Sequence, residues 1–415
     1  MVKKIISAML CVIIPFGGMI MLTSCDTVQN NYTLQFVTTP IQTDADVSTI
    51  PCDITLSDTT FSATPSSFSK DLSLLSLTLS SAAYSYTYAL DNLETLGFEH
   101  FGKFNYSDEY NSNAVGTIIA SKKLYDTTIV AIIFRGTFEK EWFSNFDIGR
   151  DVNTTKVHSG FNKAREFALK KLDMYIANYG IDRDHCKFLV TGHSRGGAVA
   201  NLVSKSLIDT YGPSNVYAYT FATPNTTTDE NASDNRYAGI FNFINPEDFI
   251  AYIPLKSWGF TKYGTTIAFP KNNSNDTYNE KLRKVSQYYE SLKGRKLKTF
   301  GGTKQMEEFI NTAFKLAPSI TDYYDTKYEI AGLQLSVHEY MTVVANVLTN
   351  ENIISNGLIL MSSDGTAFEP FSNYIMSGME TESDGFSLDY DNSMIAYAHT
   401  AETYLAWMYV YTEDM

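Results

Sequence analysis

A serine flanked by glycines lies between a short apolar strand and a helical segment, and this junction limits the possible folds of the chain more than any other feature. The apolar residues 188–190 are typical of a buried strand, and residues 196–209 have the spacing of a helix. Between them, Gly192, Ser194 and Gly196 form a G-x-S-x-G sequence. Glycines permit a sharp turn that a Cβ would block, and the turn lifts the serine clear of the backbone. The junction predicts a nucleophile elbow, with a purely structural turn as the alternative.

The same alternation of strands and helices extends on both sides of this junction. Apolar runs predict further strands, and stretches with a helical period predict helices between and around them. We therefore expect a mostly parallel sheet covered by helices on both faces. The expected strands are 115–121, 127–134, 216–221 and 240–244, and the expected helices are 72–84, 163–178 and 400–411.

A serine hydroxyl becomes a good nucleophile only when a histidine accepts its proton and an acid orients that histidine. In a sheet of this kind the chain order is serine, acid, histidine. Asp248 follows the expected strand 240–244, with its neighbour Glu247 as the rival acid. Of the two histidines that follow, His399 lies between an apolar stretch and the last helix, whereas His338 lies within an apolar helix. The pattern favours Ser194, Asp248 and His399, and His338 stays open as the rival base.

Composition narrows the possible functions. The 415 residues carry a formal charge of −14, and 44% of them are hydrophobic. This mixture is typical of a globular chain and excludes a disordered or coiled-coil protein. The negative charge argues against nucleic acid as a partner. No C-x-x-C or H-E-x-x-H spacing occurs, so we expect no metal and no cofactor.

The N-terminus has the form of a secretory signal. Lys3 and Lys4 precede a nearly uncharged apolar run, and the run ends in Leu-Thr-Ser before Cys25. This ending resembles a bacterial lipobox, which implies cleavage after residue 24, lipidation of Cys25 and an extracytoplasmic protein anchored to the cell membrane by lipid. The alternative is an uncleaved transmembrane anchor. Cys52 and Cys186 can form at most one disulfide, and buried free thiols are the favoured interpretation.

Five segments together resemble the class 3 lipases, the fungal-lipase-like branch of the α/β-hydrolases. They are residues 134–137, 157–161, 192–197, 248–254 and 399–405. The resemblance implies the α/β-hydrolase fold and hydrolysis of lipid esters by acyl transfer. It also implies that Thr137 and the backbone N–H of Arg195 form the oxyanion hole, and that His158 is structural. Residues 221–225 depart from the family's F-G-x-P turn, and the interval between Asp248 and His399 is longer than typical.

The sequence divides into three parts: a signal peptide at 1–24, a tether and edge segment at 25–70, and a hydrolase domain at 71–415. A helical insert at about 272–356 accounts for the long interval before His399. Residues 280–298 of this insert are rich in Lys and Arg, which is typical either of a solvated helix face or of a patch that faces lipid headgroups. The oligomeric state stays open. The alternative functions are an esterase for plant or polysaccharide-linked acyl groups and a non-catalytic surface-binding lipoprotein.

Overall fold

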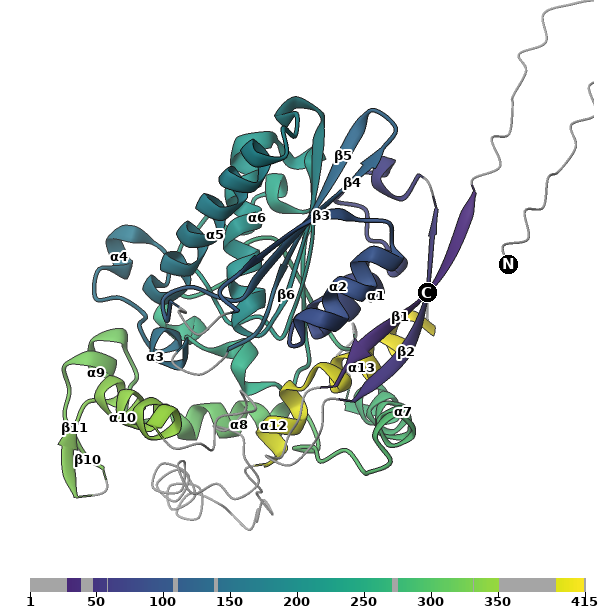
Figure 1. Cartoon of the computed structure of the whole chain (residues 1–415). Coiled ribbons are helices and arrows are strands. Elements are labelled where there is room, and N and C mark those ends of the chain that lie inside the picture. The colour runs from purple at the N-terminus through teal and green to yellow at the C-terminus, as the bar shows by residue number, and fades with distance from the viewer. Residues whose placement is uncertain are drawn as a thin grey trace, which may run out of the picture.

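The centre of the molecule is a seven-stranded sheet with the order β3-β4-β5-β6-β7-β8-β9 (Figure 1). The computed structural model describes residues 28–38, 48–57, 59–106, 111–137, 141–270, 275–330, 332–350 and 393–413. The strands are β3 (Glu99–Phe104), β4 (Thr117–Leu124), β5 (Thr127–Phe134), β6 (Cys186–His193), β7 (Val216–Phe221), β8 (Ile240–Ile244) and β9 (Thr265–Ala268). Strands β5 to β9 pair in parallel, and β3 and β4 add an antiparallel edge. The expectation of a mostly parallel sheet is confirmed.

Helices cover both faces of this sheet because its central strands are apolar on both sides. Along β5, Ile129, Ala131 and Ile133 belong to one core cluster, while the alternate residues Val130 and Ile132 belong to the other. The second cluster is closed by α5 (Ser159–Asn178) and α6 (Arg195–Tyr211). The first is closed by α1 (Lys70–Ala82), α2 (Tyr86–Thr95) and α13 (Ala401–Glu413). A strand buried on both faces is typical of parallel sheets between helices.

Residues 29–57 depart from the expected edge of the sheet. β1 (Gln29–Val37) and β2 (Thr49–Ser57) pair with each other as a separate antiparallel hairpin. Leu34, Phe36 and Ile54 are buried in the same cluster as α1 and α13. This part of the predicted tether therefore packs as a further layer over the helices (Figure 1). The signal segment 1–24 and Cys25 lie outside the described residues.

Among the described residues, four helices and a second hairpin lie between β9 and the last two helices. They are α7 (Asn275–Lys293), α8 (Thr303–Ala313), α9 (Ile320–Tyr324), β10 (Tyr328–Ile330), β11 (Leu333–Leu335) and α10 (Val337–Asn350). Figure 1 shows α8, α9 and α10 gathered at one end of the molecule, beside α12 (Ser393–His399). The end of the expected insert, at 351–356, lies outside the described residues. Two short helices, α3 (Trp142–Asn145) and α4 (Val152–Thr155), follow β5.

Part of the basic segment faces inward. Lys293, at the end of α7, forms an ion pair of 3.0 Å with Glu402, whose side chain is fully buried in α13. The cationic groups of Arg295 and Lys298 lie over the ring of Tyr397. These three basic groups therefore bind the insert to the C-terminal helices.

The cysteines and the helices settle two smaller points. Cys52 and Cys186 are both free and buried, so the expectation of buried thiols is confirmed. Within the described ranges, every helix is too short or too polar to span a membrane.

Candidate active site

Ser194 lies at the turn between β6 and α6 with φ 59° and ψ −128°, a backbone conformation that few residues other than glycine adopt. Close packing enforces the turn. A Cβ on Gly192 would lie 2.3 Å from the carbonyl oxygen of Gly196, and one on Gly196 would lie 2.5 Å from that of Phe134. The G-x-S-x-G glycines therefore permit contacts between backbones, and these contacts hold the serine in its strained conformation.

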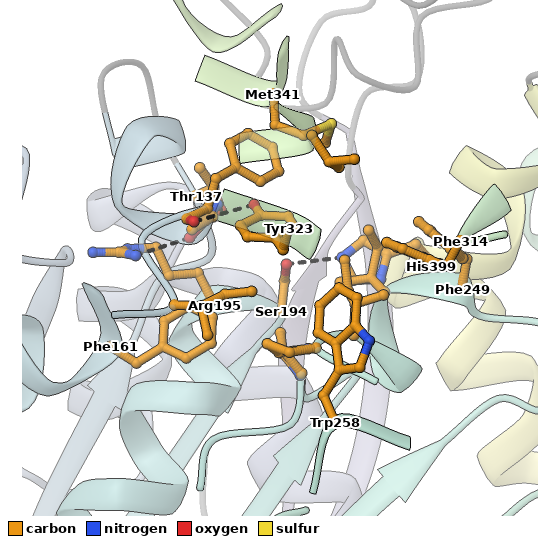
Figure 2. Close-up of a pocket in the computed structure, with 18 of the residues that line it drawn as sticks. Thr137, Phe161, Ser194, Arg195, Phe249, Trp258, Phe314, Tyr323, Met341 and His399 are labelled. Atoms are coloured by element: carbon orange, nitrogen blue, oxygen red, sulfur yellow. Dashed lines mark hydrogen bonds between the residues drawn. The ribbon is translucent and has the colours of Figure 1, made fainter. Parts of the chain in front are cut away.

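His399, the last residue of α12, lies between Ser194 and Asp248. Its Nε2 is 2.8 Å from Oγ of Ser194, and its Nδ1 is 2.9 Å from Oδ2 of Asp248. The exposed fractions are 8% for Ser194, 2% for His399 and 0% for Asp248. Figure 2 shows the serine and the histidine side by side, joined by the dashed line of this hydrogen bond. The structure thus brings together the three residues that the sequence singles out, although they come from distant parts of the chain.

Asp248 follows β8 and is held by groups on two sides. Its Oδ1 accepts from the backbone N–H of Ile250 at 3.0 Å, and its Oδ2 accepts from the hydroxyl of Tyr404 at 2.7 Å. The same hydroxyl accepts from the backbone N–H of Asn245 at 3.0 Å. Tyr404 lies five residues after His399, and no spacing rule marks it as a partner of the acid. It is a site residue that the sequence analysis missed.

The rival acid points elsewhere. Glu247 accepts from the hydroxyl of Tyr278 at 2.8 Å and from the backbone N–H of Phe300 at 2.7 Å. Burial raises the pKa of its carboxyl group, and these hydrogen bonds oppose the rise. Glu247 therefore joins the strand end to α7 and to the loop before α8.

The rival base lies against aromatic rings of the insert. His338 in α10 packs beside Tyr324, with ring centroids 4.8 Å apart, and beside Tyr323 at 5.7 Å. Burial lowers the pKa of its imidazole. The position next to the serine hydroxyl belongs to His399.

His193, directly before the serine, supports the backbone of His399. Its Nε2 lies 2.9 Å from the carbonyl oxygen of His399, and its Nδ1 lies 2.9 Å from the hydroxyl of Tyr84. Complete burial holds the pKa of His193 well below its usual range, and the nearby His399 lowers it further. A neutral ring that donates from Nε2 and accepts at Nδ1 satisfies both contacts. The histidine within G-H-S-R-G therefore has a structural partner that spacing alone does not reveal.

Lys262 is buried and contacts the loops next to Asp248. Lys262 donates from Nζ to the carbonyl oxygens of Thr223 and Ala251, both at 2.7 Å, and to Oδ1 of Asn225 at 2.9 Å. Three acceptors require the three N–H groups of a charged ammonium. Burial lowers the pKa of Lys262 to about 7, and the charge of Asp248 opposes this shift. The ammonium joins the loop after β7 to the turn that Asp248 begins.

An apolar pocket opens next to Ser194. Thr137 and Arg195, the two expected oxyanion residues, line it together with Ser194 and His399. The rest of the lining is almost entirely hydrophobic, and part of it comes from the segment between β9 and α12. The apolar members include Phe146, Ile148, Phe161, Phe249, Ile250, Ile253, Trp258, Phe314, Tyr323, Val337, Met341 and Ile395 (Figure 2).

The described part of the chain offers no metal centre, since no three of its His, Cys, Asp and Glu side chains are grouped to hold an ion. We assign no residues to a cofactor.

The parallel sheet, the serine elbow after β6 and the acid after β8 define an α/β-hydrolase. Residues 131–258 match the model of a family described as lipase (class 3). The chain therefore has the α/β-hydrolase fold, and this segment is similar to class 3 lipases.

Individual relatives match a quarter to a half of the chain, all below 30% identity. The secreted mono- and diacylglycerol lipase 1 of Fusarium solani is 29% identical over 110 residues, which are 25% of this chain and 32% of that protein. The match thus spans about a third of the relative. The triacylglyceride lipase of Rhizomucor miehei is 22% identical, with a TM-score of 0.35 over 49% of this chain and 80% of the other. Lipase II from Rhizopus niveus is 18% identical, with a TM-score of 0.36 over 49% and 81%.

Proposed function

We propose that this chain hydrolyses carboxylic esters of lipids, acylglycerols above all, through an acyl-enzyme on Ser194. The observation that carries the proposal is the 2.8 Å contact between Oγ of Ser194 and Nε2 of His399 at the wall of an apolar pocket. A serine, a histidine and a buried carboxylate in this order are the parts that nucleophilic acyl transfer requires.

Each group has one chemical task. His399 removes the proton of Ser194 as the serine oxygen attacks the ester carbonyl, and Asp248 orients the imidazole and stabilises its charged form. The backbone N–H of Arg195, at the start of α6, and the hydroxyl of Thr137 donate to the oxyanion. His399 then returns the proton to the leaving alcohol, and water releases the acid by the same steps. The loss of one oxyanion donor typically raises the barrier by about 3 kcal/mol.

The pocket favours a fatty acyl chain over a polar acyl group. Its lining is hydrophobic, and burial of each CH₂ group contributes about 0.8 kcal/mol. The Fusarium relative is a mono- and diacylglycerol lipase, which supports glycerides as the substrate class.

Labelling with a fluorophosphonate and turnover of p-nitrophenyl esters test the nucleophile. We expect Ser194→Ala to abolish both and to leave the fold intact. Ser66→Ala, at an exposed serine, is the matched control and should retain both. Retained turnover in Ser194→Ala would refute the assignment, and no turnover in the wild type with any ester would favour a binding lipoprotein. A rate that falls as the acyl chain lengthens would favour the polysaccharide-linked esterase.

We also propose that the mature protein begins at Cys25 and is anchored outside the cytoplasm by a lipid on that thiol. The sequence before Cys25 and the secreted relative support this location. Cys25→Ser should release the protein from the membrane fraction and abolish incorporation of labelled fatty acid. Retention of Cys25→Ser in the membrane fraction would favour an uncleaved anchor.

A further inference from the structure

A chain of hydrogen bonds connects the side chain of Arg195 to the expected oxyanion hydroxyl. Nη1 of Arg195 donates to Oδ1 of Asn145 at 2.8 Å, and Nδ2 of Asn145 donates to Oγ1 of Thr137 at 2.9 Å. Nη2 of Arg195 donates to the carbonyl oxygen of Ala114 at 3.1 Å, which fixes the guanidinium. Arg195 is 1% exposed although it borders the pocket.

Donor and acceptor chemistry fixes which group donates in each of these hydrogen bonds. A guanidinium has only donors, so the amide of Asn145 must turn its oxygen toward Arg195. The NH₂ group then faces Thr137, and the hydroxyl can only accept from it. The hydroxyl proton of Thr137 is thus left to point elsewhere, and Thr137 lines the same pocket as Ser194 (Figure 2).

We propose that Arg195 acts through its side chain as a positioning residue, which orients Asn145 and thereby holds the Thr137 hydroxyl as a donor toward the substrate oxyanion. Arg195 would then serve the reaction twice, through its backbone N–H directly and through its guanidinium at a distance. The inference rests on the proposed function and adds a role for a side chain that the reaction itself does not touch.

We call the hydrogen-bonded series of Arg195, Asn145 and Thr137 the relay. Neighbouring elements hold its first two members, Arg195 and Asn145. The guanidinium of Arg195 lies 5.8 Å from the ring of Phe161, and Phe161 stacks on His158 with ring centroids 3.9 Å apart. A Cβ on Gly160 would lie 1.8 Å from the carbonyl oxygen of Ser144, so α5 touches the backbone directly before Asn145. The segment 158–161 thereby fixes both ends of the Arg195–Asn145 bond.

A double-mutant cycle tests the relay, because it separates an action through Thr137 from a general structural effect. Thr137→Val removes the hydroxyl and should lower kcat about 100-fold with little change in KM. Arg195→Met keeps the backbone N–H and should lower kcat about 10-fold or more in the wild type. In the Thr137→Val background it should lower kcat less than about 2-fold, since the hydroxyl is already absent. Equal losses in both backgrounds, or no loss in the wild type, would overturn the relay.

Asn145→Asp tests the same relay without removing a buried cation. The carboxylate keeps the shape of the amide and can pair with Arg195, but it has no N–H, so the hydroxyl of Thr137 would donate to it instead of to the oxyanion. We expect kcat to fall about 10-fold or more, with KM and the thermal unfolding temperature maintained. Asn178→Asp, at an exposed position, is the matched control. An unchanged kcat in Asn145→Asp overturns the relay. Failure of the proposed function is distinct, because Ser194→Ala would then retain the activity on which the cycle is measured.

Discussion

The hydroxyl of Tyr404 donates to Oδ2 of Asp248 at 2.7 Å, on the same carboxylate oxygen that His399 contacts. The acid is thus held from α13, which follows the base in the chain. Tyr404→Phe should lower kcat/KM about 10-fold, in the range of one hydrogen bond to a charged group. Tyr409→Phe, on the same helix but in contact with Cys52, is the control. An unchanged kcat/KM in Tyr404→Phe would contradict this role of the hydroxyl.

The buried ion pair between Lys293 and Glu402 provides a second prediction. The side chains are 13% and 0% exposed, so removal of the cation leaves a buried carboxylate. Lys293→Met should lower the free energy of unfolding by about 3–5 kcal/mol, measured by urea denaturation. The double variant Lys293→Met, Glu402→Gln should regain much of this loss, because the uncompensated charge is gone. A loss below about 1 kcal/mol in Lys293→Met would instead indicate a solvated pair.

His158 makes stability depend on pH. Burial lowers its pKa to about 3, whereas an unfolded histidine has a pKa of about 6.5. The unfolded chain therefore binds the proton first. The contribution is complete above about pH 6.5 and is lost as pH falls toward 3, by about 1.4 kcal/mol per pH unit. Urea denaturation at pH 7 and pH 5 measures the loss.

The matched variant is His158→Asn, because His158 caps α5 by accepting from the backbone N–H of Phe161, and an asparagine can also cap a helix. The stability of His158→Asn should fall less between pH 7 and pH 5 than that of the wild type. Equal losses would show that His158 does not titrate in this range.

Lys262 provides the fourth prediction. Lys262→Met leaves three acceptors without their ammonium donor, so it should lower the free energy of unfolding by about 3 kcal/mol or more. Lys122→Met is the control, since the half-buried Lys122 also donates to a backbone carbonyl, that of Leu96, at 2.7 Å. Its loss should stay below about 1 kcal/mol. Similar losses in the two variants would show that the burial of Lys262 has no special cost.

The sequence predicts the central sheet well and the parts around it less well. The ranges expected for 127–134, 216–221 and 240–244 agree with β5, β7 and β8, because a strand buried on both faces is apolar throughout. The sequence does not predict strand β3, because the polar residues Glu99, His100 and Lys103 are more typical of a loop. The hairpin at 29–57 has alternating polar residues, which is typical of an edge strand as well as of an independent hairpin.

The candidate site likewise contains residues that the sequence predicts and residues that it does not. Ser194, Asp248 and His399 can be selected from sequence because chain order and flanking elements restrict each choice. Tyr404, Asn145 and the side chain of Arg195 cannot be selected, because their roles depend on how α13, α3 and α6 pack in three dimensions. Local pattern identifies the serine, the acid and the histidine, and only packing identifies the side chains that hold the acid and the Thr137 hydroxyl.

The position of His399 after the insert sets an order in time. Ribosomes synthesise Ser194 first, then Asp248, then the helices that supply Phe314 and Met341 to the pocket, and only then the base. A growing or truncated chain that has not reached α12 has a serine without a proton acceptor. Under the proposed mechanism such a chain cannot hydrolyse an ester, and hydrolysis begins only after the apolar wall of the pocket has been made.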